Sequence, residues 1–330
     1  MQISVIGAGT WGTAIASLAA ISHPTRLWVR RPDLAEQIRT SRRNQDYLPE
    51  LELSPKILVT DDMEEALKGC DLVLVAVPSH GFRKVFSVVS KHLSTSVPVT
   101  SLTKGIEVET CSRMTEIIAE LQPGRDPRLT GVLTGPNLAH EILKGEPTAA
   151  VAAFSDPDVA RTVQDALMGP AFRIYTNGDV VGCELAGCIK NVLAIAIGMA
   201  RGLGFGSNTM ATLITRALAE ETRLGVSLGG RPETFAGLAG MGDLIATCQS
   251  SKSRNSRVGF ALASGKSLSE ILEATNTVAE GVNSVRPILE LSKRMGAEMP
   301  IAEQVGLAIE QGVQPTRILQ SLMSRGPKPE

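Results

Sequence analysis

The sequence predicts an α/β N-terminal domain built on a doubly wound, mostly parallel sheet, followed by an all-α C-terminal domain. Three observations predict this fold class. Short β-branched runs alternate with helical patterns in the first half, strand-like runs become scarce after residues 177–179, and a glycine-rich turn joins the first strand to the first helix. Such alternation is typical of a parallel sheet with helices on both faces. We therefore expect two domains, residues 1–180 and 181–330, in line with a prior of roughly 150 residues per domain.

The individual elements follow from the local hydrophobic pattern. We expect strands at residues 3–6, 26–29, 56–59, 72–77, 97–102, 131–133 and 149–152. We expect helices at 33–41, 62–67, 83–91 and 113–121, and in the second domain at 181–200, 210–224, 268–274, 282–293 and 302–311. The run from Asp71 to Pro78 is apolar between its ends. This pattern is expected of a central strand that is covered on both faces.

Charge and cysteine content exclude several classes of function. Lys plus Arg is 33 and Asp plus Glu is 34, so the net charge is −1. Without a global basic field we expect no nucleic-acid partner, and any anion site must be local. The chain has five cysteines, and none of them forms a CxxC pair. We expect neither a disulfide framework nor a metal site.

The location of the protein is predicted from its apolar segments. The N-terminus has no basic region followed by a signal-peptide cleavage site, and the odd cysteine count fits a reducing compartment. The most apolar stretch, residues 183–199, contains Glu184, Lys190 and Asn191. A membrane span tolerates such charges poorly. We therefore expect a buried helix, no membrane insertion and a cytoplasmic protein.

A glycine-rich turn follows the first predicted strand. Gly7, Gly9 and Gly12 form a GxGxxG motif between residues 3–6 and a helical pattern at 13–20. In a Rossmann-type domain the first glycine permits the tight turn, the second lets the backbone approach a pyrophosphate, and the third lets the helix pack closely. The pyrophosphate lies at the helix N-terminus, where free N–H groups favour an anion. The motif predicts a dinucleotide cofactor.

The residues that follow the second predicted strand indicate which dinucleotide is bound. A site specific for NAD tends to have Asp or Glu there, which bonds the ribose hydroxyls. This chain has Arg30 and Arg31 instead. Two arginines can hold a 2′-phosphate through charge-assisted bonds, so NADP(H) is favoured and NAD(H) remains possible. The alternative interpretation is a solvated turn, because exposed arginines are common.

A single lysine lies within the apolar helix at 181–200. Lys190 is the only basic residue between 179 and 194. Burial would lower its pKa toward neutrality, the range that a proton donor and acceptor needs. The alternative is a lysine whose stem is buried and whose amine reaches water.

Two further segments offer groups that bind anions. Glycines at 237–242 and Asp243 precede Ser253, Arg254 and Asn255, which supply hydroxyl, guanidinium and amide donors suited to phosphate. The alternative is a solvated basic loop. Lys104 follows the fifth predicted strand, at the carboxyl edge where doubly wound sheets bind ligands.

These blocks together resemble the bacterial-type glycerol-3-phosphate dehydrogenases that use NAD(P)+. The resemblance covers nearly the whole chain. The motifs that carry it are GAGTWGTA at 7–14, VPS at 77–79, TKGIE at 103–107, TGPNLAHEI at 134–142, ELAGCIKN at 184–191, GLAGMGDLIATC at 237–248, SRN at 253–255, VAEGV at 278–282 and MPI at 299–301.

The resemblance implies specific roles. Residues implied at the cofactor are Thr10, Trp11, Arg31, Lys104, Ala139, Arg254, Val278 and Glu280. Residues implied at the substrate are Lys104, Gly135, Asn137, Lys190, Asp243, Ser253, Arg254 and Asn255. Lys190 would be the general acid/base. The family's third block usually reads SGPSFA, whereas this chain has Asn137 at its fourth position.

The implied reaction is reversible hydride transfer that reduces dihydroxyacetone phosphate to sn-glycerol 3-phosphate for phospholipid synthesis. We expect a homodimer. One rival is a dehydrogenase of similar architecture that acts on a 3-hydroxy acid or a sugar-acid phosphate, which would need a different substrate loop. A rival of another class is a catalytically idle NADP-binding redox sensor.

Overall fold

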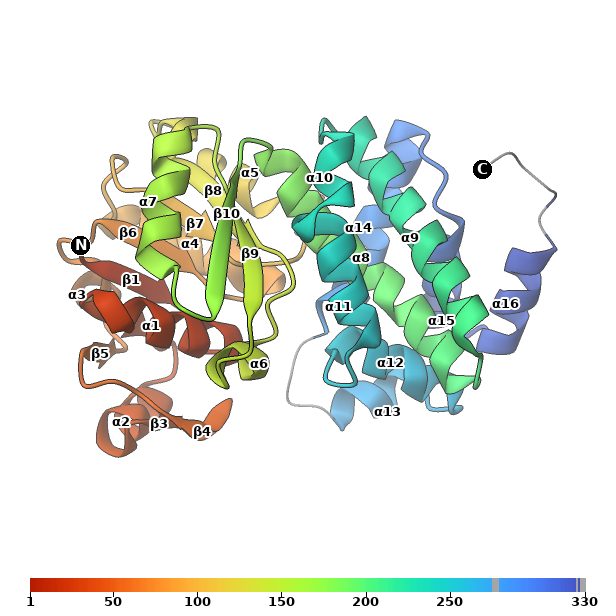
Figure 1. The fold of residues 1–330 in the computed structure, drawn as a ribbon, viewed down its shortest axis with the longest axis horizontal. Coiled ribbons are helices and arrows are strands. Elements are labelled where there is room, and N and C mark those ends of the chain that lie inside the picture. The colour runs from red at the N-terminus through yellow and green to blue at the C-terminus, as the bar shows by residue number, and fades with distance from the viewer. Residues whose placement is uncertain (275–278, 325, 327–330) are drawn as a thin grey trace. The chain divides into compact units, whose positions relative to one another are not determined.

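The computed structural model describes residues 1–274, 279–324 and 326, which form two compact units (Figure 1). The first unit comprises Met1–Thr103 and Arg113–Val180, and the second comprises Lys104–Ser112 and Val181–Glu330. The excursion Lys104–Ser112 belongs to the second unit because helix residues hold it there. Asn191 Nδ2 donates to the Lys104 carbonyl at 2.9 Å, and Cys188 Sγ donates to the Gly105 carbonyl at 3.1 Å.

The first unit is built on an eight-stranded sheet with the strand order β10-β9-β8-β7-β6-β1-β2-β5. Its strands are β1 (Ile3–Ile6), β2 (Thr25–Trp28), β5 (Ile57–Thr60), β6 (Leu72–Val75), β7 (Val99–Ser101), β8 (Thr130–Thr134), β9 (Thr148–Ala153) and β10 (Phe172–Asn177). The strands from β5 to β8 are parallel, β8 pairs antiparallel with β9, and β9 pairs parallel with β10. Numbered along the sheet strands, the parallel part has the order 3-2-1-4-5-6 of dinucleotide-binding domains. The predicted fold class is confirmed.

Side chains of the central strands alternate between two apolar cores, because successive strand residues point to opposite faces. Val5 and Leu74 contribute to one core, and Ile6 and Val75 contribute to the other. The first core is covered by α1 (Thr10–Ser22), α2 (Pro32–Ser41) and α7 (Pro157–Leu167), and the second by α3 (Met63–Leu67), α4 (Ser79–His92) and α5 (Met114–Leu121). Figure 1 shows α1 and α7 on the near face of the sheet. The central strand is therefore covered on both faces, as predicted.

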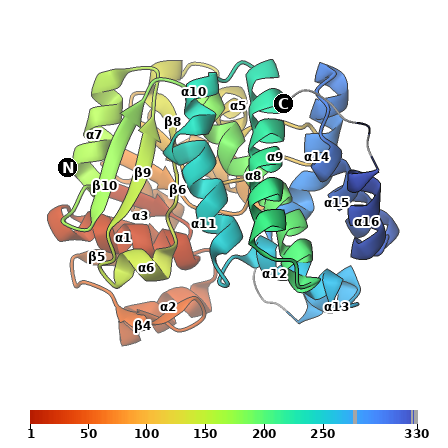
Figure 2. The ribbon, with the colours of Figure 1, turned by 45° about the vertical axis from the view of Figure 1, so that its right-hand side comes forward.

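A small hairpin has no counterpart among the predicted elements. Strands β3 (Arg43–Asn44) and β4 (Leu48–Glu52) pair antiparallel, and the hairpin lies beside α2 (Figures 1 and 2). The buried Asn44 amide anchors it, donating at 2.8 Å both to the Ala8 carbonyl and to Thr13 Oγ1. A two-residue strand carries no hydrophobic period, so the sequence pattern could not reveal it. The hairpin is nevertheless attached directly to the glycine-rich turn.

Helix α8 (Val180–Gly202) is the central element of the second unit. Every residue from Gly182 to Ala200 is buried. By length and composition alone α8 could cross a membrane, but 89% of its apolar window is buried inside the protein. The prediction of a buried helix is confirmed.

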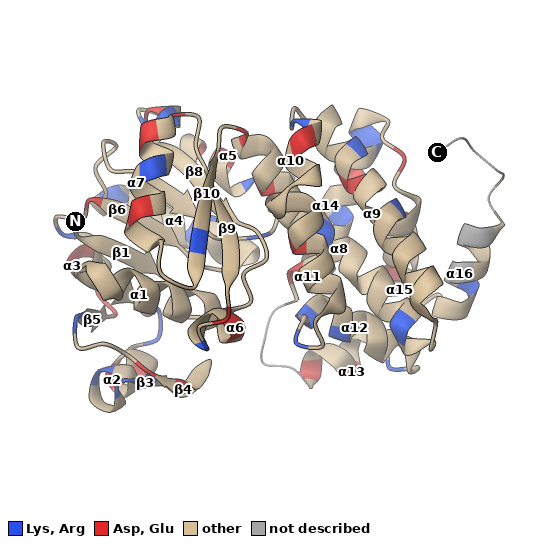
Figure 3. Cartoon of the chain, viewed as in Figure 1, with Lys and Arg blue, Asp and Glu red and all other residues tan. Residues whose placement is uncertain are grey.

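Shorter helices surround α8 in the second unit. They are α9 (Ser207–Ser227), α10 (Pro232–Ala236), α11 (Asp243–Gln249), α12 (Arg254–Ala263), α13 (Leu268–Glu273), α14 (Glu280–Met295), α15 (Pro300–Gln311) and α16 (Pro315–Met323). Of these, α9, α13, α14 and α15 correspond to predicted helices. Basic and acidic residues are interspersed along the helices of both units (Figure 3).

Glycines let two helices approach α8 very closely. A Cβ at Gly198 of α8 would lie 2.2 Å from the Ser256 carbonyl oxygen of α12, and one at Gly259 of α12 would lie 2.0 Å from the Ile195 carbonyl oxygen. A Cβ at Gly281 of α14 would lie 2.4 Å from the Asn191 carbonyl oxygen. The N-terminal turns of α12 and α14 are thus held against the middle of α8.

Candidate active site

The glycine-rich turn has the geometry that a dinucleotide requires. Gly7 has φ +112°, and a Cβ there would lie 2.5 Å from the Ala76 carbonyl oxygen. A Cβ at Gly12 would lie 1.9 Å from the Gly7 carbonyl oxygen, whereas one at Gly9 would meet no atom of the described part of the chain within 4 Å. Helix α1 has no side-chain cap at its N-terminus, so the N–H groups of Thr10 and Trp11 can face an anion. The turn fits a pyrophosphate.

Alanine substitutions at Gly12 and Gly9 test this geometry separately. We expect Gly12→Ala to destabilise the protein by about 1–3 kcal/mol, because its Cβ overpacks the turn, and to weaken NADPH binding. We expect Gly9→Ala to keep wild-type thermal stability, since the space around Gly9 is open, but still to weaken NADPH binding. Thermal unfolding and NADPH fluorescence titrations measure both quantities. Wild-type NADPH affinity in Gly9→Ala would show that no pyrophosphate approaches this turn.

The two arginines after β2 have different surroundings. Arg31 precedes α2, forms an ion pair with Asp46 of the β3–β4 hairpin, and has Nε 3.9 Å from Asp33 Oδ1. The hydrogen bond with Asp46 is the main cause that raises the pKa of the Arg31 guanidinium. Arg30 is exposed and has no ion pair with any described residue. Arg30 is therefore open to solvent, whereas Arg31 is already bound to a carboxylate.

The remaining predicted residues of the first unit lie near β8 and α1. Gly135 follows β8 with φ +116°, and Ala139 is buried at the start of α6 (Ala139–Leu143). Asn137 lies between them and is partly buried. The half-buried Trp11 packs edge-on against Phe172, with ring centroids 6.4 Å apart.

A shared aspartate joins two lysines in the second unit. Lys190 Nζ donates to Asp243 Oδ1 at 2.7 Å and to Thr247 Oγ1 at 2.5 Å, and Lys104 Nζ donates to Asp243 Oδ2 at 2.8 Å. Side-chain exposure is 5% for Lys190, 3% for Asp243 and 17% for Lys104. The alternative of an amine that reaches water is therefore wrong for Lys190. The structure brings together three residues that are widely separated in sequence.

Burial controls the electrostatics of this group. It lowers the pKa of Lys104 to about 8, although the Asp243 carboxylate partly opposes the shift. Glu221 of α9 is fully buried, and neither of its carboxyl oxygens has a hydrogen-bond partner among the residues that the structure describes. Burial first, and then the charge of Asp243, raise the pKa of Glu221 well above its usual value. This shift disfavours a second carboxylate charge beside the lysines, and it leaves Asp243 as the hydrogen-bonded counter-charge that both of them share.

A chain of amides extends from the lysines to α12 and α14. Asn255 Nδ2 donates to Asn191 Oδ1 at 2.8 Å, and the Gly281 N–H donates to Asn255 Oδ1 at 3.0 Å. Ser253 caps α12 by accepting the Ser256 N–H at 3.3 Å. Ser253 and Asn255 are buried, so the solvated-loop alternative is wrong for them, whereas Arg254 is exposed. Of the other predicted residues, Glu280 begins α14 and Val278 lies outside the described residues.

The segment at 237–257 is helical apart from a short turn at residues 250–253, although its composition predicts a polar loop. It contains a π-helical turn at Leu238–Gly242, helix α11, and the start of α12. Glycine and small polar residues favour helices weakly, so tertiary packing determines this structure. A Cβ at Gly240 would lie 2.2 Å from the Phe235 carbonyl oxygen. The helical path aims Asp243 and Thr247, one turn apart on α11, at Lys190.

Sequence reasoning missed three residues of the group. Thr247 could have been found, because it lies four positions after Asp243 and shares its helix face. Asn191 neighbours Lys190 within the ELAGCIKN motif, and only its contacts with Lys104 and Asn255 reveal its place. Glu221 gives no signal in the sequence of α9.

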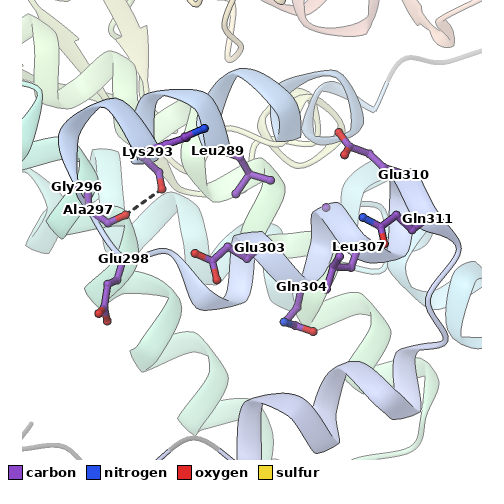
Figure 4. Close-up of a pocket in the computed structure, with 12 residues that line it drawn as sticks. Leu289, Lys293, Gly296, Ala297, Glu298, Glu303, Gln304, Leu307, Glu310 and Gln311 are labelled. Atoms are coloured by element: carbon purple, nitrogen blue, oxygen red, sulfur yellow. Dashed lines mark hydrogen bonds between the residues drawn. The ribbon is translucent and has the colours of Figure 1, made fainter.

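A separate hollow of about 610 Å³ lies in the second unit (Figure 4). Residues of α14 and α15 line it, including Leu289, Glu303 and Leu307. None of its lining residues is a predicted site residue. It is therefore distinct from the group around Lys190.

Comparisons with known proteins identify the family of the chain. Family models described as the N-terminus and the C-terminus of NAD-dependent glycerol-3-phosphate dehydrogenase match residues 2–160 and 179–320. The chain is 48% identical over 305 residues to glycerol-3-phosphate dehydrogenase (NAD(P)+) 2 of Sphingopyxis alaskensis, which covers 92% of this chain and 91% of that protein. It is 47% identical to the Thermobifida fusca enzyme of the same type, which covers 100% of this chain and 98% of that protein.

A solved structure shows the same fold. The crystal structure of glycerol-3-phosphate dehydrogenase from Coxiella burnetii superposes with a TM-score of 0.94 at 34% identity, and the match covers 98% of this chain and 99% of that one. The identity and coverage of these relatives, together with the two family models, determine the family. The chain belongs to the NAD-dependent glycerol-3-phosphate dehydrogenases.

Proposed function

We propose that the chain is an NAD(P)-dependent oxidoreductase that interconverts dihydroxyacetone phosphate and sn-glycerol 3-phosphate in the cytoplasm. The observation that carries the proposal is the buried Lys104–Asp243–Lys190 group. It combines a proton donor, Lys190, with a second lysine, Lys104, that can attract the phosphate of a phosphorylated ketone. The names of the relatives supply the substrate class.

The residues fit the following roles. In our proposal the Gly7–Gly12 turn of the first unit holds the cofactor pyrophosphate, and the second unit binds the substrate. The nicotinamide, when bound, supplies the hydride that adds to C2 of the ketone. Lys190 donates a proton from Nζ to the oxygen that develops negative charge at C2. Asp243 and Thr247 fix the direction of Nζ, because both accept its hydrogen bonds.

The other site residues orient the substrate. Lys104 offers a second ammonium group, whose charge attracts the phosphate. Gly135, Asn137, Ser253, Arg254 and Asn255 are proposed as further substrate contacts, and Trp11, Ala139 and Glu280 as cofactor contacts. NADP(H) is the proposed preferred cofactor, supported by Arg30 and Arg31. The homodimer stays a prediction.

The direct test follows oxidation of NADPH, and separately of NADH, with dihydroxyacetone phosphate. We expect turnover with both cofactors, and far less with unphosphorylated dihydroxyacetone. Activity on a 3-oxo acid instead would support the rival dehydrogenase. Tight cofactor binding by folded protein without turnover of any phosphorylated ketone would support the idle sensor, which gives no reason for a buried Lys190–Asp243 pair.

The pH dependence tests the role of Lys104. Its pKa of about 8 means that the free enzyme has a charged Lys104 below pH 8 and loses that charge as the pH rises. We expect kcat/KM for dihydroxyacetone phosphate to fall above about pH 8, since kcat/KM reports groups of the free enzyme. Lys104→Arg keeps its charge and should move the decline to higher pH. Identical profiles for the two proteins would refute this role.

A further inference from the structure

The β3–β4 hairpin brings a carboxylate to the end of β2, where the sequence itself has only arginines. Asp46 lies in the turn between β3 and β4, and it hydrogen-bonds Arg31 Nη2. The two side chains are 45% and 47% exposed, so a nucleotide can reach both. An acidic residue at this place in a Rossmann-type domain ordinarily accepts the ribose hydroxyls of NAD. Asp46 supplies that acid from another segment of the chain.

The hairpin holds Asp46 in a fixed place relative to the cofactor turn. The buried Asn44, two residues before Asp46, bonds both the Ala8 carbonyl and Thr13 Oγ1. Gln37 of α2 donates from Nε2 to the Arg43 carbonyl at 3.0 Å. The position of Asp46 is thus coupled to the turn that would bind the pyrophosphate.

The charges of Arg31 and Asp46 have opposite effects on a 2′-phosphate. A 2′-phosphate would compete with Asp46 for the Arg31 guanidinium and would be repelled by the Asp46 carboxylate. A free ribose hydroxyl would meet no such repulsion and could donate to that carboxylate. Arg30 is left as the cation without an ion pair in the described part of the chain.

We propose that Asp46 is a specificity-determining residue. Its carboxylate lowers the preference of the site for a 2′-phosphate, so that the protein can bind NAD(H) as well as NADP(H). The inference rests on the proposed function, because it concerns the nucleotide that the Gly7–Gly12 turn would bind.

The test measures nucleotide binding without turnover. Calorimetry gives the affinities of 2′,5′-ADP and 5′-AMP for the wild type, Asp46→Asn, Asp46→Glu and Asp33→Asn. Removal of the Asp46 charge should raise the ratio of 2′,5′-ADP affinity to 5′-AMP affinity about twofold to fivefold, as expected for one partly exposed charge pair. Asp46→Glu keeps a carboxylate and should stay near wild type. Asp33→Asn is the matched control, because Asp33 is 76% exposed and 3.9 Å from Arg31 Nε, and should change the ratio less than twofold.

Each outcome decides between the two proposals. An unchanged ratio in Asp46→Asn, from protein with wild-type thermal stability, overturns the inference and leaves the proposed function intact. An equal rise in Asp33→Asn also overturns it, because any nearby charge would then act alike. If neither nucleotide, nor NADP(H) nor NAD(H), binds to the folded wild type, the proposed function and the inference fail together.

Discussion

Lys190→Met should lower kcat by about two to four orders of magnitude, the usual contribution of a positioned general acid or base. Methionine keeps the apolar stem on the buried face of α8 and removes only the ammonium group, so the fold should survive. Asp243 would keep its bond to Lys104. Steady-state turnover of dihydroxyacetone phosphate with NADPH measures the effect.

Two controls show whether the loss of turnover is specific to Lys190. The affinity for NADPH, measured by fluorescence, should change less than about threefold, because the cofactor turn belongs to the other unit. Lys252→Met removes an exposed lysine from the turn before α12 and should keep wild-type kcat. A Lys190→Met protein that turns over within tenfold of wild type would rule out Lys190 as the proton donor.

The second large effect concerns stability. Asp243→Asn removes the carboxylate that both lysines share, and it leaves the buried Lys190 ammonium and the partly buried Lys104 ammonium without that counter-charge. Breaking a buried ion pair on one side costs about 3–5 kcal/mol, so the free energy of unfolding should fall by that amount. Urea unfolding at neutral pH measures it. Turnover should fall as well, because Lys190 loses the acceptor that directs its Nζ.

A double variant tests whether the loss of stability comes from the uncompensated charges. Lys104→Met together with Asp243→Asn removes one of the two uncompensated cations, so it should recover part of the lost stability. If Asp243→Asn stays within about 1 kcal/mol of wild type, Asp243 does not hold the two lysine cations, since that small cost is typical of an exposed pair.

Much of the first unit could be predicted from local pattern. The apolar run of β6 predicts a strand that is buried on both faces, and the GxGxxG spacing predicts the tight turn after β1. These two patterns locate the centre of the sheet. Strand β10 was missed although Phe172 and Ile174 are buried and Arg173 and Tyr175 are exposed. Its alternation is the usual sign of a strand with one solvated face, and it could have been recognised.

The rest of the site depends on contacts between distant segments. Lys104 and Asp243 are separated by 139 residues, and no period in the chain predicts that they share one carboxylate. The helical path of residues 238–249 likewise follows from packing against Phe235 and α9, not from the propensity of its glycines. The sequence indicated the residue types of the site, and tertiary structure determined their pairing.

The glycine contacts of α8 limit which substitutions the second unit can accept. Where Gly198 and Gly259 meet the facing helix, main chain touches main chain, so the two helices cannot come closer together than they are. A side chain at either position would push the two helices apart and would move Asn255 relative to Asn191. The arrangement of the site therefore depends on two glycines that are not themselves site residues.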